Sequence, residues 1–177
     1  MHGKTDIIII RGAPGSGKSQ TAKSLSQFFP KGVRLEVDTI RQMVISVDWK
    51  NQQEHIDMLE ASAKLVCEFL KFNFRPVIVV DTFSGDKINR YLNTLYQLEE
   101  KLSIKIFGLF TTDAELKRRL DARTNAEFKD FPICKRLNDD VLKWKHDNEF
   151  QVDTTGLSPI QTAEKIYEEI ASKLSDD

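Results

Sequence analysis

The chain has 177 residues, of which 40% are hydrophobic and 30% charged, and its formal net charge is −1. This size and composition are typical of one globular domain with a well-buried core, so we expect a single domain over residues 1–177. The near-neutral charge argues against tight non-specific binding to nucleic acid or to an anionic membrane surface.

Strands and helices alternate through the first half of the chain. Residues 7–11 form a continuous apolar run before a glycine-rich turn, which predicts a strand buried on both faces. Apolar side chains then recur at helical spacing over residues 18–29, and Pro30 and Gly32 end this helix. The same patterns predict a strand over 33–37, a short helix from Ile40, a long helix over 54–74 and a strand over 75–83.

The alternation continues to the end of the chain. Asp113 is placed to cap one helix, and Ser158 followed by Pro159 is placed to open the last helix. Such alternation predicts an α/β fold in which helices cover both faces of a five-stranded parallel sheet. The other elements of this half are strands over 104–110 and 150–155 and helices over 88–102 and 133–147.

The two cysteines, Cys67 and Cys134, have no spacing typical of a metal site or a redox pair. Each is expected to be a small buried side chain in a reducing compartment. No apolar run is long enough to cross a bilayer. We therefore expect a cytoplasmic protein with no membrane association.

The turn after the first strand reads "GAPGSGKS" and fits the phosphate-binding pattern G-x-x-x-x-G-K-[ST]. Glycines let the backbone approach an anion closely, and the N–H groups at the start of the next helix point toward it. Lys18 is expected to contact the β- and γ-phosphates, and Ser19 is expected to bind Mg²⁺. The residues predicted to bind the nucleotide are Gly12, Ala13, Pro14, Gly15, Ser16, Gly17, Lys18, Ser19 and Gln20.

Asp38 and Arg41 follow the second strand. The carboxyl ends of parallel strands open onto one edge of the sheet, so Asp38 should face the same crevice as the phosphate loop. A carboxylate in that place can accept the proton of an attacking hydroxyl, and Arg41 can hold the acceptor or the transferring phosphoryl group. Position alone leaves open the alternative that Asp38 only caps a short helix.

Asp81 closes the third strand in "VIVVD", which is a Walker B pattern. Such a carboxylate reaches Mg²⁺ through water, so Asp81 is a candidate metal residue together with Ser19. The alternative is that Asp81 orients Asp38, Arg41 or the substrate.

The stretch "LKRRLDAR" carries two arginines on one helical face. Arg119 and Arg123 are four residues apart, opposite Leu116 and Leu120. Two guanidinium groups above the crevice suit the charge spread over a transferring phosphoryl group. A charge run of this kind also fits an ordinary solvated helix face, and Arg118 is expected to face solvent.

With these motifs the chain resembles the small P-loop phosphotransferases, a family that includes polynucleotide kinases, gluconate kinases, chloramphenicol phosphotransferases and zeta toxins. The resemblance extends from Ile7 to about Thr155 and is strongest in "GAPGSGKS", "VDTIRQ", "VVDTF" and "RLDAR". It implies the three-layer α/β/α P-loop NTPase fold, with the strand order of nucleoside-monophosphate kinases and a helical lid over about residues 119–135.

The resemblance also implies roles for single residues. In the family, an aspartate just after the second strand is the base that activates the acceptor hydroxyl, and Asp38 matches it. In polynucleotide kinases a catalytic arginine follows three residues later, which Arg41 matches, and Arg119 and Arg123 match an arginine pair in their lid. The loop after the last strand, here residues 153–155, often lies near the adenine.

Two departures from polynucleotide kinases leave the acceptor open. Thr39 follows Asp38 where those kinases often have a second acidic residue. The stretch after Arg41 is largely apolar, whereas their acceptor groove is basic. Trp49 is the aromatic residue best placed there to stack on a ring, although a tryptophan in such a place more often packs against a helix.

The sequence therefore predicts a kinase that binds ATP and Mg²⁺ and transfers the γ-phosphate to a hydroxyl of a small molecule or of a nucleic-acid 5′ end. We expect a monomer or a weak homodimer. A GTPase would need an N-K-x-D motif, which the chain lacks, and an AAA-type motor would need further modules and a longer chain. The alternative that stays open is a regulatory or non-catalytic ATP-binding module. The residues predicted to be catalytic are Lys18, Asp38, Arg41, Arg119 and Arg123.

Overall fold

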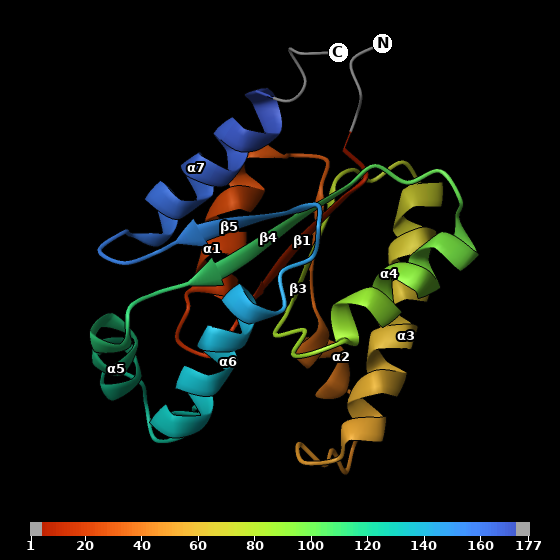
Figure 1. The fold of residues 1–177 in the computed structure, drawn as a ribbon. Helices are drawn as coiled ribbons and strands as arrows, with labels where there is room; N and C mark the ends of the chain where they lie inside the picture. The colour runs from red at the N-terminus through yellow and green to blue at the C-terminus, as the bar shows by residue number, and fades with distance from the viewer. Residues whose placement is uncertain (1–4, 173–177) are drawn as a thin grey trace.

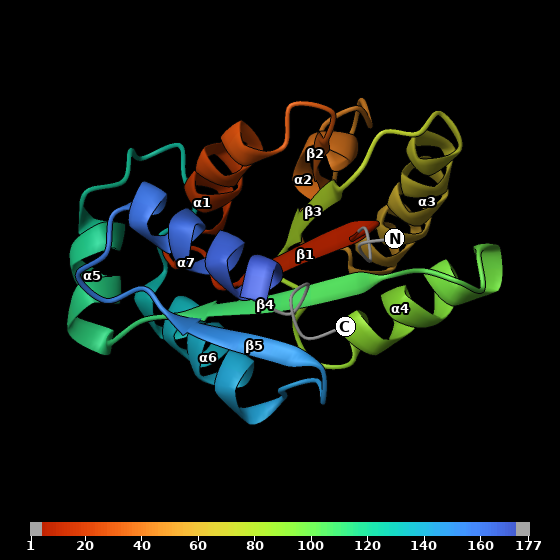
Figure 2. The same cartoon turned by 90° about the horizontal axis from the view of Figure 1, so that it is seen from above.

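A computed structural model describes residues 5–172, so residues 1–4 and 173–177 of the expected domain lie outside the described residues. Five parallel strands form one sheet in the order β2-β3-β1-β4-β5 (Figures 1 and 2). This sheet confirms the predicted number of strands and their parallel direction. The strands are β1 (Ile7–Gly12), β2 (Val33–Glu36), β3 (Val77–Asp81), β4 (Ile104–Phe110) and β5 (Glu149–Asp153).

Helices cover both faces of the sheet, which gives the predicted three layers. Figure 2 shows α1 and α7 together on one face, with α3 and α4 side by side on the other. The helices are α1 (Lys18–Leu25), followed by a 3₁₀ turn (Ser26–Phe28), α2 (Val37–Arg41), α3 (Gln52–Lys71), α4 (Lys87–Leu98), α5 (Asp113–Asp121), α6 (Phe131–Lys143) and α7 (Pro159–Ser172).

The central strand β1 is buried on both faces, as its apolar run predicts. Ile7 and Ile9 pack into the core beneath α3 and α4, whereas Ile8 and Ile10 pack into the core beneath α1 and α7. Side chains of a strand alternate between the two faces, so one strand joins both cores. Each of these fully buried isoleucines contributes about 2 kcal/mol of hydrophobic burial.

Several helix ends differ from the sequence prediction, and local hydrogen bonds account for two of these differences. The first helix was expected to reach Phe29, but α1 ends at Leu25 and a 3₁₀ turn follows. Ser26 Oγ donates to the carbonyl of Ala22 at 2.8 Å, a local hydrogen bond that competes with regular helix. The cap of α5 is Thr112 instead of Asp113, because the extended Thr112 accepts a hydrogen bond from the Glu115 N–H.

The predicted lid range of 119–135 spans the end of α5, the connecting loop 122–130 and the start of α6. A small separate core joins these two helices through Leu116, Leu120 and Cys134. Cys134 and Cys67 are both buried free thiols, as expected. No helix within residues 5–172 is long and apolar enough to cross a membrane.

The functional residues expected from the sequence gather at one edge of the sheet. In the parallel register Arg11 of β1 lies beside Asp81 of β3, and Glu36 of β2 lies beside Val80. The carboxyl ends of these strands therefore meet, and the phosphate loop follows β1 directly.

Candidate active site

The phosphate loop links β1 to α1 in the strand–turn–helix context that the motif requires. Gly15 and Gly17 have positive φ angles of 89° and 92°, which glycine adopts without strain. Gly17 is also the N-cap of α1, and among the described residues no side chain makes a capping hydrogen bond at this end of the helix. The first N–H groups of α1 are thus left for an anion, which is favoured at the positive end of a helix.

Lys18 is the first residue of α1, and its ammonium group donates to the carbonyl of Ala13 at 3.5 Å. Burial lowers its pKa, and the negative charges of Asp81 and Asp38 oppose that shift. The lysine, which the motif predicts as a phosphate ligand, thus shares its surroundings with both candidate carboxylates.

A cavity of about 530 Å³ opens between the phosphate loop, the lid and the loop after β5. Its lining includes Gly15 to Thr21 of the loop and first helix, Arg119 and Arg123 of the lid, and Thr154. The predicted nucleotide site is therefore hollow on the side where the two lid arginines lie. Thr154 falls in the stretch 153–155 that the family resemblance places near the adenine.

Arg119 is fixed by hydrogen bonds on both sides of this cavity. Its Nη1 donates to Thr154 Oγ1 at 2.9 Å and, at longer distances, to the carbonyls of Gly15 and Ser16. Its Nη2 donates to the Thr154 carbonyl at 2.6 Å, and its Nε donates to Glu115. The guanidinium thus joins the lid helix, the phosphate loop and the loop after β5.

Arg123 has fewer partners. Its Nη1 donates to the carbonyl of Phe128 at 2.7 Å, and its Nε lies 3.9 Å from the Glu127 carboxylate. Both partners belong to the exposed loop between α5 and α6. The charge of Arg123 acts on Lys18, so this arginine stands close to the phosphate loop without being tied to it.

Glu115, in the first turn of α5, accepts hydrogen bonds from two arginines of the same helix. Hydrogen bonds from Arg118 and Arg119 lower the pKa of its carboxyl to about 2, with a smaller opposing contribution from burial. Arg118 is exposed, as the sequence predicts, and it still forms two hydrogen bonds to Glu115.

Asp38 lies in the first turn of α2 at the carboxyl end of β2. The N-cap of this helix is Glu36, and neither residue makes a side-chain capping hydrogen bond. The Asp38 side chain reaches solvent. Its pKa is nevertheless raised, first by desolvation in the surrounding protein and then by the negative charge of Asp81, while Lys18 opposes the shift.

Arg41 is buried instead of standing free in the crevice. Its Nη2 donates to the carbonyl of Asp48 at 3.1 Å and lies 3.8 Å from the Glu54 carboxylate. Its guanidinium carbon lies 4.6 Å from the centroid of the Trp49 ring, a cation–π contact. Arg41 thus joins the loop after α2 to the start of α3, and Trp49 packs against it.

Asp81 is buried at the end of β3 and has a partner that the sequence analysis did not find. Its Oδ1 lies 3.1 Å from His55 Nε2, and its Oδ2 accepts a hydrogen bond from the Phe83 N–H at 2.8 Å. The other ring nitrogen of His55 lies 3.1 Å from Lys87 Nζ. One signal was available, since His55 lies on the buried stripe of α3, one turn before Leu59.

The donor set fits a magnesium–nucleotide complex. Among residues 5–172 there is no group of three or more His, Cys, Asp or Glu that could hold a metal ion alone. Mg²⁺ bound with a nucleotide needs only one or two protein oxygens, because phosphates and water complete its shell. The Ser19 hydroxyl and the Asp81 carboxylate supply oxygens of this kind.

The chain belongs to the AAA domain family, whose model matches residues 7–144. The AAA-type ATPases share the name of this family, so the expectation from the sequence that set an AAA-type ATPase aside does not extend to the domain itself. No curated protein sequence matches the chain.

Solved structures of small kinases resemble the chain over nearly its whole length. A gluconokinase from Sinorhizobium meliloti has 17% identity and a TM-score of 0.64, and the match covers 96% of this chain and 95% of that one. The APS kinase CysC of Mycobacterium tuberculosis, solved with AMPPNP and APS, has 13% identity and a TM-score of 0.70, with 98% and 99% covered.

A third similar structure is that of the Pnkp1/Rnl/Hen1 RNA repair complex, with 22% identity and a TM-score of 0.65. This match covers 84% of this chain and 48% of that chain. At such identities the likeness concerns the fold. The fold of this protein is that of the P-loop kinases, as the family resemblance implies.

Proposed function

We propose that this protein is a kinase that transfers the γ-phosphate of ATP to a hydroxyl group. The observation that carries the proposal is that Lys18, which follows β1, and Asp38, which follows β2, lie at the same edge of the parallel sheet, where each acts on the pKa of the other. A lysine for the phosphates beside a carboxylate for the acceptor is what in-line transfer to a hydroxyl needs. A module that only binds ATP has no use for the carboxylate.

Each residue has one role in this proposal. Asp38 accepts the proton of the acceptor hydroxyl, and its raised pKa brings it closer to the pH at which a general base works best. Lys18 and the N–H groups of the phosphate loop hold the triphosphate. Arg123 exchanges its loop partners for the transferring phosphoryl group. Arg119 holds the phosphate loop and the loop after β5 together around the adenine.

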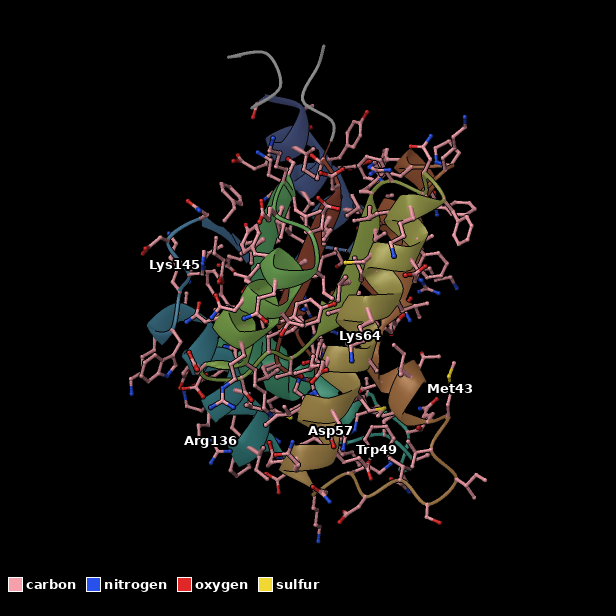
Figure 3. All side chains as sticks on the ribbon, turned by 90° about the vertical axis from the view of Figure 1, so that its right-hand side faces the viewer. Met43, Trp49, Asp57, Lys64, Arg136 and Lys145 are labelled. Atoms are coloured by element: carbon pink, nitrogen blue, oxygen red, sulfur yellow. The ribbon has the colours of Figure 1, made fainter. Side chains whose placement is uncertain are left out.

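Mg²⁺ would be held by Ser19 and Asp81 and would neutralise charge on the β- and γ-phosphates. Arg41 stabilises the acceptor side, because its contacts fix the loop after α2, which contains Met43 and Trp49. Figure 3 shows Met43 at the outer rim of this loop and Trp49 near the start of α3. Met43 is 73% exposed and Trp49 is 48% exposed, which suits an acceptor with an apolar or flat part.

The test is transfer of label from γ-labelled ATP, with Mg²⁺, to a panel of acceptors. The panel contains gluconate, APS and an oligonucleotide with a 5′-hydroxyl, because the similar structures include a gluconokinase, an APS kinase and an RNA repair complex. Asp38→Asn runs beside the wild type. We expect label on one acceptor class with the wild type and about 10³-fold slower transfer with the variant.

The contrary outcomes are distinct. Normal transfer by Asp38→Asn would remove Asp38 from the mechanism. ATP binding without transfer to any hydroxyl compound, in this panel and in a wider one, would favour the regulatory or non-catalytic module.

A further inference from the structure

The Asp81 carboxylate is held at both of its oxygens. The Phe83 N–H donates to Oδ2 at 2.8 Å, and the ring of His55 contacts Oδ1 at 3.1 Å. Only 5% of Asp81 is exposed, so water does not replace these partners easily. The His55 contact is the one that a side chain supplies, and it therefore depends on a residue that can be changed without altering the backbone.

Lys87 determines which nitrogen of His55 carries the proton. The lysine Nζ lies 2.7 Å from Gln52 Oε1 and 3.1 Å from His55 Nδ1. An ammonium group has only donors, so Nδ1 must be an acceptor in this contact. The ring proton then sits on Nε2, which donates to Asp81. Lys87, His55 and Asp81 form a line of hydrogen bonds from α4 through α3 to β3.

The end of this line lies beside the reacting groups. The negative charge of Asp81 acts on Lys18, which it stabilises in the charged form, and on Asp38, which it disfavours in the charged form. Interactions between charges depend strongly on distance in a partly buried site. A carboxylate that rotates or moves at Asp81 would therefore disturb both the phosphate ligand and the candidate base.

On the basis of the proposed kinase function, we propose that His55 is a positioning residue for phosphoryl transfer. It fixes the Asp81 carboxylate at the end of β3, beside the strand that leads into the phosphate loop, and Lys87 fixes the tautomer of His55 that makes this possible. His55 itself touches neither the nucleotide phosphates nor the acceptor hydroxyl.

Two substitutions separate positioning from simple filling of space. His55→Gln keeps an amide N–H that can donate to Asp81 and an amide oxygen that can accept from Lys87. His55→Leu has a similar volume but neither group. We expect His55→Leu to lower kcat of transfer by about 10- to 100-fold, with KM for ATP nearly unchanged, and His55→Gln to retain most of the wild-type kcat.

His146→Gln is the matched control, because His146 accepts a hydrogen bond from the Asn148 N–H far from the crevice. We expect this substitution to leave kcat unchanged. Thermal unfolding of all three variants reports whether each is folded. Wild-type kcat in folded His55→Leu overturns the proposal. An equal loss of kcat in His55→Gln and His55→Leu also overturns it, since the restored hydrogen bonds would then have no effect.

A second measurement does not need an acceptor. Nitrogen NMR of the imidazole rings reports the tautomer of His55, with His55→Gln used to assign its signals. We expect a proton on Nε2 in the wild type and a mixture of tautomers in Lys87→Met, which lacks the ammonium group. A proton on Nδ1 in the wild type overturns the proposal. If the wild type binds ATP but phosphorylates no acceptor, the kinase proposal fails, and the NMR result alone decides how His55 contacts Asp81.

Discussion

The two sides of the crevice are built in different ways. The nucleotide side consists of consecutive residues, 12–20, which include the uncapped first turn of α1, and of two lid arginines from one helix and its end. On the acceptor side, Asp38, His55, Asp81 and Lys87 come from four separate elements. Hydrogen bonds between side chains join His55 to Asp81 and to Lys87, and the charge of Asp81 acts on Asp38.

This difference has consequences for substitution. A site made of backbone groups depends on conformation, so its glycines are the sensitive positions. A site made of linked side chains depends on every member, because each buried polar group needs its partner. The following predictions test that contrast, from the largest expected effect to the smallest.

The largest effects are expected for Lys18→Ala and Asp38→Asn, and they should differ in kind. Loss of Lys18 removes a charged phosphate ligand, so ATP affinity should fall by about 10- to 100-fold together with transfer. Loss of the Asp38 charge should leave ATP affinity nearly unchanged while transfer falls by about 10³-fold. Calorimetric titration with ATP, beside the transfer assay, separates the two. A comparable loss of ATP affinity in both variants would show that the two sides are not independent.

The lid arginines should separate in the same way. Within residues 5–172, the hydrogen bond and the ion pair of the Arg123 side chain are both with groups of its own loop, so Arg123→Ala should lower kcat by about 10³-fold and leave folding stability unchanged. Arg119 holds Gly15, Ser16 and Thr154 together, so Arg119→Ala should destabilise the protein by about 2 kcal/mol and raise KM for ATP. Denaturant unfolding and steady-state kinetics measure both. The prediction fails if the two variants have the same stability and the same KM.

The nucleotide side could be predicted from the sequence because its parts are adjacent in the chain. The strand, the glycine-rich turn and the helix follow one another, and their order alone places the phosphate loop at the end of β1. The alternation of elements likewise predicted the parallel sheet and its helical layers. The sequence pattern could not predict the hydrogen bonds of Arg119, because its partner Thr154 is 35 residues away and lies beyond α6 and β5.

The acceptor side could be predicted only in part. Asp81 ends β3 and Asp38 follows the end of β2, so the rule for parallel sheets places both at the crevice. His55 was missed because its partners are 26 and 32 residues distant. The buried stripe of α3 predicts that His55 is buried but does not indicate which side chains it contacts. Arg41 was predicted at the acceptor, yet its side chain lies against Glu54 and Trp49, contacts that only the packing of the loop on α3 creates.

Substitution of two glycines with positive φ should sharpen the comparison further. An added Cβ at Gly15 would lie 2.8 Å from Leu116 Cδ1, whereas at Gly85, on the loop after β3, it would meet nothing within 4 Å. Both Gly→Ala variants carry the backbone strain of about 1–2 kcal/mol, but only Gly15→Ala also moves the lid helix. We expect ATP affinity to fall about tenfold in Gly15→Ala, a loss of about 1.4 kcal/mol, and to be unchanged in Gly85→Ala. Equal ATP affinities in the two variants would contradict this prediction.

The smallest effect is a shift in pH dependence that also separates the two sides. The pKa of Asp38 is raised above its ordinary value of 3.8 by desolvation and by Asp81, while hydrogen bonds from Arg118 and Arg119 lower the pKa of Glu115 to about 2. In the proposed mechanism transfer needs the Asp38 anion, so on acidification kcat should fall at a higher pH than an ordinary aspartate would give. Glu115 stays ionised at that pH, so its hydrogen bond with Arg119 is kept.

ATP binding should therefore persist on the acid limb where kcat has already dropped. The check is kcat and ATP affinity measured over the same pH series, with Glu115→Gln as control. Glu115→Gln should weaken the hydrogen bond from Arg119 without shifting the pH at which kcat falls, because that pH is set by the pKa of Asp38 in the proposed mechanism. A limb that moves with Glu115→Gln, or an ATP affinity that falls in parallel with kcat, would mean that the nucleotide side, and not the acceptor side, sets the pH dependence.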